Sequence, residues 1–242
     1  MTTFSGHFSP LQGMIADAWR ELILSAGGTP ARAGLRLWTG ELPPDPGPEW
    51  APDWLPRLDE ERKRQWAEIR LPERRQEWLI ARGLELALRD EASSSGTEPS
   101  PGSLGTSGTL LSSVSHTRAV TGKGGRPEAG VVAVAYPSAD RIAGVGVDLE
   151  REDRFIDPRI RSRLLGPDEG ERVPDLLDAW VVKEACFKSV PDNQATLLPD
   201  YVITAWDSAS GHGKARGPAG QECFFLLLRR EGWVIALAVS RQ

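Results

Sequence analysis

A short segment in the second half of the chain, residues 143–150, constrains the fold more than any other. Every second residue in it is apolar and branched, which predicts a β-strand with one buried face. The buried positions are Val145, Val147 and Leu149. The opposite face carries two carboxylates, Asp148 and Glu150, about 7 Å apart. Two glycines precede them on that face, Gly144 and Gly146, and they let another element or a ligand come close to the backbone.

The two carboxylates at the end of this strand have two interpretations. Asp148 and Glu150 repel each other unless a cation lies between them, and ligands that are all oxygen favour Mg²⁺ or Mn²⁺. The alternative is a strand end exposed to water, where both carboxylates are simply solvated. The strand by itself does not decide between a metal site and a solvated terminus.

A second segment, Trp180 to Lys188, predicts a helix that is apolar almost all round, as buried helices are. At about 100° per residue, its charged residues fall on one face, and these are Lys183, Glu184 and Lys188. Charges on a buried helix need partners. We therefore expect Glu184 to complete a metal site with Asp148 and Glu150, and both lysines to face an anion. The alternative is a surface helix with an ordinary i,i+4 ion pair between Glu184 and Lys188.

Helices mix with mostly antiparallel strands along the chain, so the expected fold class is α+β. Ser9 and Pro10 predict the start of a first helix that reaches about Leu24. The later helices are expected at 59–66, from 72 onward, at 157–166 and at 174–190. The strands are expected at 35–42, 110–115, 131–136, 142–150, 201–206, 222–228 and 233–239.

The expected domain organisation has three parts. Residues 1–33 form an N-terminal extension with one helix, residues 34–138 an N-terminal lobe, and residues 139–242 a C-terminal lobe with the charged motifs. Residues 92–108 are almost entirely serine, glycine, threonine, proline and glutamate. Such a composition buries too little apolar surface to order itself, so a flexible loop is expected within the N-terminal lobe.

Composition excludes several classes of partner. The net charge of −5 gives no overall basic field that would attract nucleic acid. The two cysteines, Cys186 and Cys223, lack the spacing of metal ligands, which fits a reducing cytoplasm. Neither a secretion signal nor an apolar run of about 20 residues is present, so no membrane partner is expected. We expect a cytoplasmic monomer.

Two further motifs indicate neither a dinucleotide-binding loop nor a nucleophile–base pair. Gly144 and Gly146 lack the third glycine of a dinucleotide-binding loop, since Leu149 stands at that position. Ser115 and His116 are neighbours on a predicted strand, so their side chains point to opposite faces and they do not form a nucleophile–base pair.

Taken together, three carboxylates and two lysines suit a metal-bound pyrophosphate, and their motifs resemble those of a known family. Gly146-Val-Asp-Leu-Glu150 followed by Trp180-Val-Val-Lys-Glu-Ala-Cys-Phe-Lys188 is similar to the paired motif of 4′-phosphopantetheinyl transferases. The similarity is greatest to the two-lobed, pseudo-dimeric type, which serves fatty-acid, polyketide and nonribosomal-peptide synthases. Ser113-Val-Ser-His-Thr117 resembles the family's Ser-His strand, and the helix segment from Arg75 to Arg82 resembles its arginine-bearing helix.

The resemblance implies two similar α+β lobes, related by a pseudo-twofold axis, around a cleft for coenzyme A. It implies that Asp148, Glu150 and Glu184 bind Mg²⁺ (or Mn²⁺) on the coenzyme A pyrophosphate. Glu184 would deprotonate a serine of an apo acyl or peptidyl carrier protein, and Lys188 would stabilise the leaving phosphate. Lys183 would lie against the phosphates. The resemblance further implies a set of contacts to the 3′-phosphate end of the nucleotide: Ser115, His116, Arg62, Arg75 and Arg82.

The activity that follows is transfer of 4′-phosphopantetheine from coenzyme A to the carrier protein, with release of adenosine 3′,5′-bisphosphate. Two alternatives remain open. One is a non-catalytic module of the same fold that binds coenzyme A or a carrier protein. The other is an unrelated Mg²⁺-dependent phosphotransferase that uses the same three carboxylates.

Overall fold

The computed structural model describes residues 11–30, 33–41, 53–94, 110–118, 128–137, 141–173 and 175–241. The helices are α1 (Leu11–Ser25), α2 (Glu60–Glu68), α3 (Pro72–Ser94), α4 (Arg161–Leu164) and α5 (Leu176–Ser189). Short 3-10 turns lie at Leu55–Arg57, Pro158–Ile160, Asn193–Ala195 and Leu198–Asp200. The strands are β1 (Gly34–Glu41), β2 (Leu110–Arg118), β3 (Glu128–Pro137), β4 (Ile142–Arg151), β5 (Val202–Trp206), β6 (His212–Arg216), β7 (Glu222–Arg230) and β8 (Trp233–Arg241).

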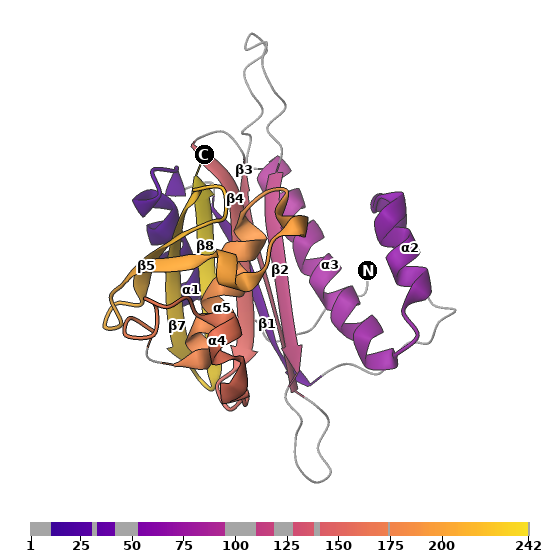
Figure 1. Ribbon diagram of the computed structural model, residues 1–242. Coiled ribbons are helices and arrows are strands. Elements are labelled where there is room, and N and C mark those ends of the chain that lie inside the picture. The colour runs from indigo at the N-terminus through magenta and orange to yellow at the C-terminus, as the bar shows by residue number, and fades with distance from the viewer. Residues whose placement is uncertain are drawn as a thin grey trace.

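The strands form two antiparallel sheets, and with the helices they confirm the α+β class (Figure 1). One sheet has the strand order β1-β3-β2, and the other has the order β4-β8-β7-β6-β5. The predicted strands are confirmed at their expected places, and β6 was not predicted. The helix predicted at 157–166 is confirmed in part: Asp157 caps a 3-10 turn at Pro158–Ile160, and the four-residue α4 continues from it to Leu164.

Local sequence signals explain where several elements begin. Asp59 caps α2, since its side chain accepts a hydrogen bond of 2.8 Å from the backbone N–H of Arg62. Pro72 opens α3, at a position where the missing N–H costs nothing. The predicted cap at Ser9 and Pro10 lies outside the described residues, as does most of the predicted loop at 92–108. No described helix is both long and apolar enough to cross a bilayer.

The edge strands of the two sheets, β2 and β4, lie side by side and run parallel. Serine hydroxyls join the two strands, where backbone-to-backbone hydrogen bonds would join neighbouring strands of one sheet. The backbone N–H of Val147 donates to Ser113 Oγ at 3.1 Å, and that of Leu149 donates to Ser115 Oγ at 3.3 Å. Because β4 would otherwise present unpaired N–H groups at this edge, the hydroxyls satisfy them at the seam between the sheets.

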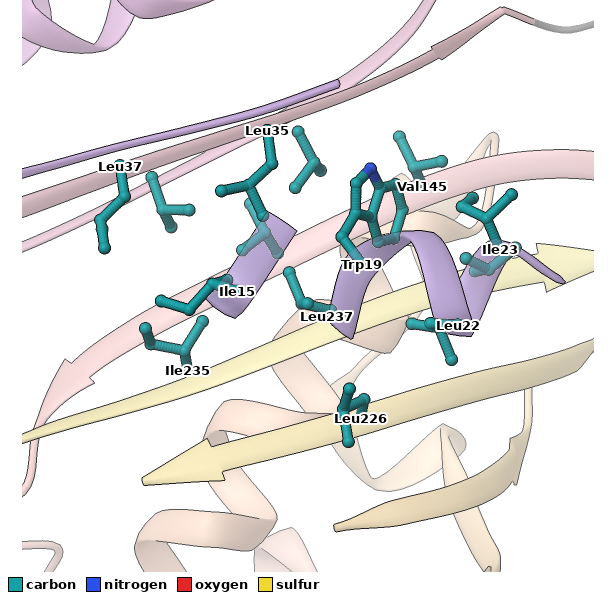
Figure 2. Packing of buried hydrophobic residues seen from close by; sticks show 14 of the residues in the cluster. Ile15, Trp19, Leu22, Ile23, Leu35, Leu37, Val145, Leu226, Ile235 and Leu237 are labelled. Carbon is teal, nitrogen blue, oxygen red and sulfur yellow. The ribbon is translucent and has the colours of Figure 1, made fainter. Parts of the chain in front are cut away.

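Helix α1 fills the space between the two sheets (Figure 2). Trp19 is fully buried at its centre and belongs to a cluster that draws residues from α1, β1, β3, β4, β7 and β8. The core members labelled in Figure 2 are Ile15, Trp19, Leu22, Ile23, Leu35, Leu37, Val145, Leu226, Ile235 and Leu237. The helix predicted within residues 1–33 therefore belongs to the central core that both sheets share.

Helix α5 packs on the opposite face of β4, directly over its two glycines. A side chain at Gly144 would place its Cβ 1.9 Å from the carbonyl oxygen of Ser189. One at Gly146 would place its Cβ 1.9 Å from the carbonyl oxygen of Ala185. The close approach predicted at these glycines is confirmed, and it brings Lys188 of α5 next to Asp148.

Replacing Gly146 with alanine should force α5 away from β4, because the new Cβ meets backbone atoms that have no freedom to rotate aside. We expect a loss of about 1–3 kcal/mol in the free energy of unfolding, the usual cost of overpacking. Urea unfolding measures it. Gly13→Ala is the matched control, since its Cβ meets nothing within 4 Å and alanine favours a helix. Equal stability of Gly146→Ala and the wild type would contradict this packing.

Candidate functional site

The polar cluster at the seam centres on the carboxylate of Asp148, which is 5% exposed. Its Oδ1 accepts a hydrogen bond of 2.7 Å from Lys188 Nζ and another of 2.7 Å from Ser115 Oγ. Lys188 Nζ also lies 3.3 Å from Ser115 Oγ. The second oxygen, Asp148 Oδ2, is buried and has no hydrogen-bond partner among the described residues. A buried carboxylate oxygen of this kind is a position where a cation fits.

Glu184 lies one helical turn before Lys188 on α5, and its side chain is half-buried. Burial raises the pKa of Glu184 above its ordinary value. The charge of Asp148 raises this pKa further, while the charges of Lys188 and Arg154 lower it. Among the described residues, no side chain is found in a hydrogen bond or ion pair with the Glu184 carboxylate. Glu184 thus combines a free carboxylate with a raised pKa, as a proton acceptor in an active site does.

Glu150, in contrast, has a protein partner for each of its oxygens. Thr117 Oγ1 donates to Glu150 Oε2 at 2.6 Å, and Arg154 forms an ion pair with Oε1. The guanidinium of Arg154 also lies over the ring of Trp180, 5.3 Å from its centroid. Glu150 is only 7% exposed, so these contacts compensate its charge where water does not.

The three predicted metal ligands therefore fit a divalent ion unequally. Within the described ranges, no group of three or more histidine, cysteine, aspartate or glutamate side chains lies close enough together to hold a metal ion. Asp148 and Glu184 fit, because Asp148 Oδ2 and the Glu184 carboxylate are oxygen ligands with no hydrogen-bond or ion-pair partner among the described residues. Glu150 does not fit while Arg154 holds it.

Lys183 lies away from this cluster, although it was predicted to face the phosphates. Its side chain is fully buried, and its Nζ donates to Glu169 Oε2 at 2.7 Å. Glu169 also accepts from the backbone N–H groups of Gly166 and Ile203, each at 2.6 Å. Burial lowers the pKa of Lys183, and the carboxylate of Glu169 partly offsets this. A lysine enclosed in this way has no exposed face for a ligand, so the predicted contact with phosphates does not fit its position.

Ser115 and His116 point to opposite faces of β2, as the alternation predicts. Ser115 contacts Asp148 at the seam, whereas His116 Nδ1 lies 3.2 Å from Glu77 Oε2 on α3. Arg75, also on α3, is 5% exposed, and its Nη2 lies 3.5 Å from the carbonyl oxygen of Arg70. The structure thus does not bring Ser115 together with the other residues predicted for the 3′-phosphate.

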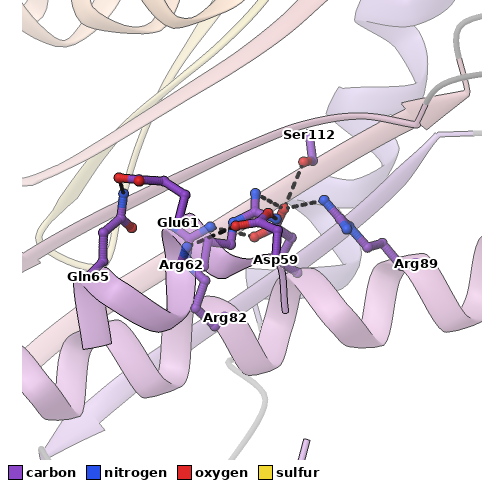
Figure 3. A network of polar contacts seen from close by, with 8 residues as sticks. Asp59, Glu61, Arg62, Gln65, Arg82, Arg89 and Ser112 are labelled. Carbon is purple, nitrogen blue, oxygen red and sulfur yellow. Dashed lines mark hydrogen bonds and ion pairs between the residues drawn. The ribbon is translucent and has the colours of Figure 1, made fainter. Parts of the chain in front are cut away.

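Two of the predicted arginines, Arg62 and Arg82, meet in a polar network around Glu85 (Figure 3). Arg62 Nη2 and Arg89 Nη2 each lie 2.9 Å from Glu85 Oε1, and Arg82 pairs with Oε2. Ser112 Oγ donates to the same carboxylate at 3.1 Å. Burial lowers the pKa of Arg82, the carboxylate of Glu85 partly offsets this, and the charges of Arg62 and Arg89 lower the pKa further. Three arginines around one glutamate make this network locally cationic. Glu85 lies about 12 Å from Glu77, the partner of His116, measured along α3 by the helical rise.

Several residues of these clusters were not predicted from the sequence. Thr117 continues the alternation of hydroxyls begun by Ser113 and Ser115, so periodicity could have identified it. Arg154 and Glu169 lie in irregular segments without periodicity, and no local signal points to their partners. Arg89 and Glu85 share a helical face with Arg82, at the spacing that predicts ion pairs within a helix.

No family model matches this sequence, and no curated protein is significantly similar to it. The resemblance to phosphopantetheinyl transferases therefore rests on the motif residues themselves. The geometry adds one fact to that resemblance. Lys188 of the second motif contacts Asp148 of the first at the seam between the sheets, and Glu184 lies near enough for the charge of Asp148 to raise its pKa.

Proposed function

We propose that this chain is a cytoplasmic 4′-phosphopantetheinyl transferase that acts on the serine of a carrier protein. The observation that carries the proposal is the convergence of Asp148, Glu184 and Lys188 from β4 and α5. Asp148 Oδ2 and the Glu184 carboxylate, which have no partner in the described part of the chain, lie near Lys188, and this combination suits a pyrophosphate with its metal ion. The proposal also draws on the resemblance of both motifs to those of this family.

The proposed roles follow from the position of each group. Asp148 and Glu184 would hold the magnesium ion, which when bound supplies charge neutralisation at the pyrophosphate. Glu184 would accept the proton of the carrier serine as its oxygen bonds to the β-phosphorus of coenzyme A. Lys188 would move its hydrogen bond from Asp148 to the leaving phosphate oxygen, as the bond to adenosine 3′,5′-bisphosphate breaks.

The arrangement of the sheets supports the finer proposal of two pseudo-symmetric lobes. Each sheet packs a long helix on one face, α3 on the three-stranded sheet and α5 on the five-stranded sheet (Figure 1). The seam where β2 meets β4 would then be the line of contact between the lobes. We propose that coenzyme A lies along this seam, with its 3′-phosphate toward His116 or toward the cationic network of Arg62 and Arg82.

The proposal predicts that the chain modifies a carrier protein in the presence of coenzyme A and Mg²⁺. Mass spectrometry of a broad panel of apo carrier proteins should show the addition of one phosphopantetheine group to at least one of them. Asp148→Ala should lose this transfer and stay folded. Asp157→Ala is the matched control, because Asp157 pairs only with the exposed Arg159 in the described region. The absence of any addition across the panel would count against the proposal.

One observation favours a second candidate, a non-catalytic module that binds coenzyme A or a carrier protein. Protein cations already compensate two of the three carboxylates, since Lys188 pairs with Asp148 and Arg154 with Glu150. In this case binding would persist without turnover, and Glu184→Gln would leave it unchanged. Isothermal titration of the chain with coenzyme A, next to the transfer assay, separates the two candidates.

A further inference from the structure

Arg154 lies in the turn that follows β4, the strand of Asp148 and Glu150, and folds back onto that strand. Its guanidinium pairs with Glu150 and lies over Trp180 of α5, so it bridges the same two elements that a metal ion would bridge. Its side chain is 38% exposed, whereas that of Glu150 is 9% exposed. Arg154 is therefore free to move toward solvent, and Glu150 is not.

The charges around the seam show what Arg154 contributes. Asp148, Glu150 and Glu184 supply three negative charges, and Lys188 and Arg154 supply two positive charges. A third ligand strengthens the binding of a divalent ion, which prefers several anionic oxygens. Glu150 becomes available for this only when the guanidinium leaves its Oε1. Thr117 still orients the carboxylate through Oε2 at 2.6 Å.

We propose that Arg154 competes with the divalent ion for Glu150 and thereby weakens metal binding by the free chain. This inference rests on the proposed function, because it concerns the same metal site. Without a metal ion, Arg154 neutralises a buried carboxylate that would otherwise be uncompensated. When a metal ion engages Asp148 and Glu184, its charge adds to that of Lys188 and repels the guanidinium from the site. Arg154 is then a positioning residue that acts through Glu150.

Binding of Mn²⁺ alone tests this inference without any transfer reaction. Free Mn²⁺ is measured by electron paramagnetic resonance during titration of the full chain. Arg154→Gln should lower the Kd for Mn²⁺ roughly three- to tenfold, because a competing charge has been removed. Arg154→Met, which keeps packing over Trp180, should do the same. Arg159→Gln is the matched control: this arginine is exposed in the same segment and pairs with Asp157, and its Kd should equal that of the wild type.

Measuring the Arg154 variants with Glu150→Gln already in place separates two explanations of a lower Kd. One is competition between Arg154 and the ion for Glu150, and the other is the general effect of removing a positive charge near the site. Arg154 also lowers the pKa of Glu184, so its charge reaches the rest of the site. If Arg154 acts by holding Glu150, the gain from Arg154→Gln should largely disappear when Glu150 is glutamine. An undiminished gain in that background overturns the inference, as does an unchanged Kd in the Arg154 variants. Both of these results leave the proposed function intact. No Mn²⁺ binding by any variant overturns the inference and the proposed metal site together.

Discussion

Replacing Lys183 with methionine is expected to lower the free energy of unfolding by about 3–5 kcal/mol, the range seen when one partner of a buried ion pair is removed. Lys183 and Glu169 both have fully buried side chains, and their ion pair spans 2.7 Å. Methionine fills a similar volume but leaves the carboxylate of Glu169 without its counter-charge. The backbone N–H groups of Gly166 and Ile203 still donate to Glu169, but they do not neutralise it.

Urea unfolding at neutral pH measures this loss, and two further variants define its cause. Lys214→Met is the matched control, because Lys214 pairs with Glu222 at 3.1 Å with both side chains about half exposed. Such exposed pairs contribute about 0–1 kcal/mol. Lys183→Met combined with Glu169→Gln should regain part of the loss, since glutamine keeps a hydrogen-bond acceptor and removes the buried charge. A loss below about 1 kcal/mol in Lys183→Met would show that the pair is not enclosed as the structure has it.

The misplacement of Lys183 shows where the sequence stops being informative. Helix α5 is apolar almost all round, so its pattern predicts burial but does not show which neighbour covers which face. Lys183, Glu184 and Lys188 were assigned to one face, yet only the last two reach the seam. The partner of Lys183 lies in an irregular segment before α5, and pairing over such a distance leaves no periodic signal.

Strand β4 shows the opposite case, in which the sequence was sufficient. The alternation of Val145, Val147 and Leu149 predicts the buried face, and the structure confirms it. The two glycines on the other face predict a close neighbour, and α5 is that neighbour. Helix α1 was predicted only in part. Its apolar pattern predicts a helix with a buried face, but an amphipathic pattern does not reveal that two sheets enclose it.

Replacing Glu184 with glutamine should lower transfer by about 10²–10⁴-fold, the usual contribution of a positioned base, and should also stabilise the metal-free protein. The stabilisation follows from the raised pKa of Glu184. The folded chain holds this proton more tightly than the unfolded chain does, so the stability of the wild type falls as pH rises from the ordinary glutamate pKa through the raised one. Glutamine is neutral at every pH and avoids this loss. At neutral pH we expect a gain of roughly 0.5–2 kcal/mol, a size common for single stabilising substitutions.

The pH dependence distinguishes this effect from an unrelated improvement in packing. Urea unfolding in the presence of a chelator should show the gain at neutral pH, and the gain should vanish below the ordinary glutamate pKa, where Glu184 is protonated in both states. Glu171→Gln, at an exposed glutamate, should change neither stability nor transfer. Excess Mg²⁺ should stabilise the wild type more than Glu184→Gln, because only the carboxylate is a strong ligand for the ion. A variant that loses transfer without gaining stability at neutral pH would show that the ionised Glu184 does not destabilise the folded chain. Wild-type transfer by Glu184→Gln would instead show that the base of the reaction is another carboxylate.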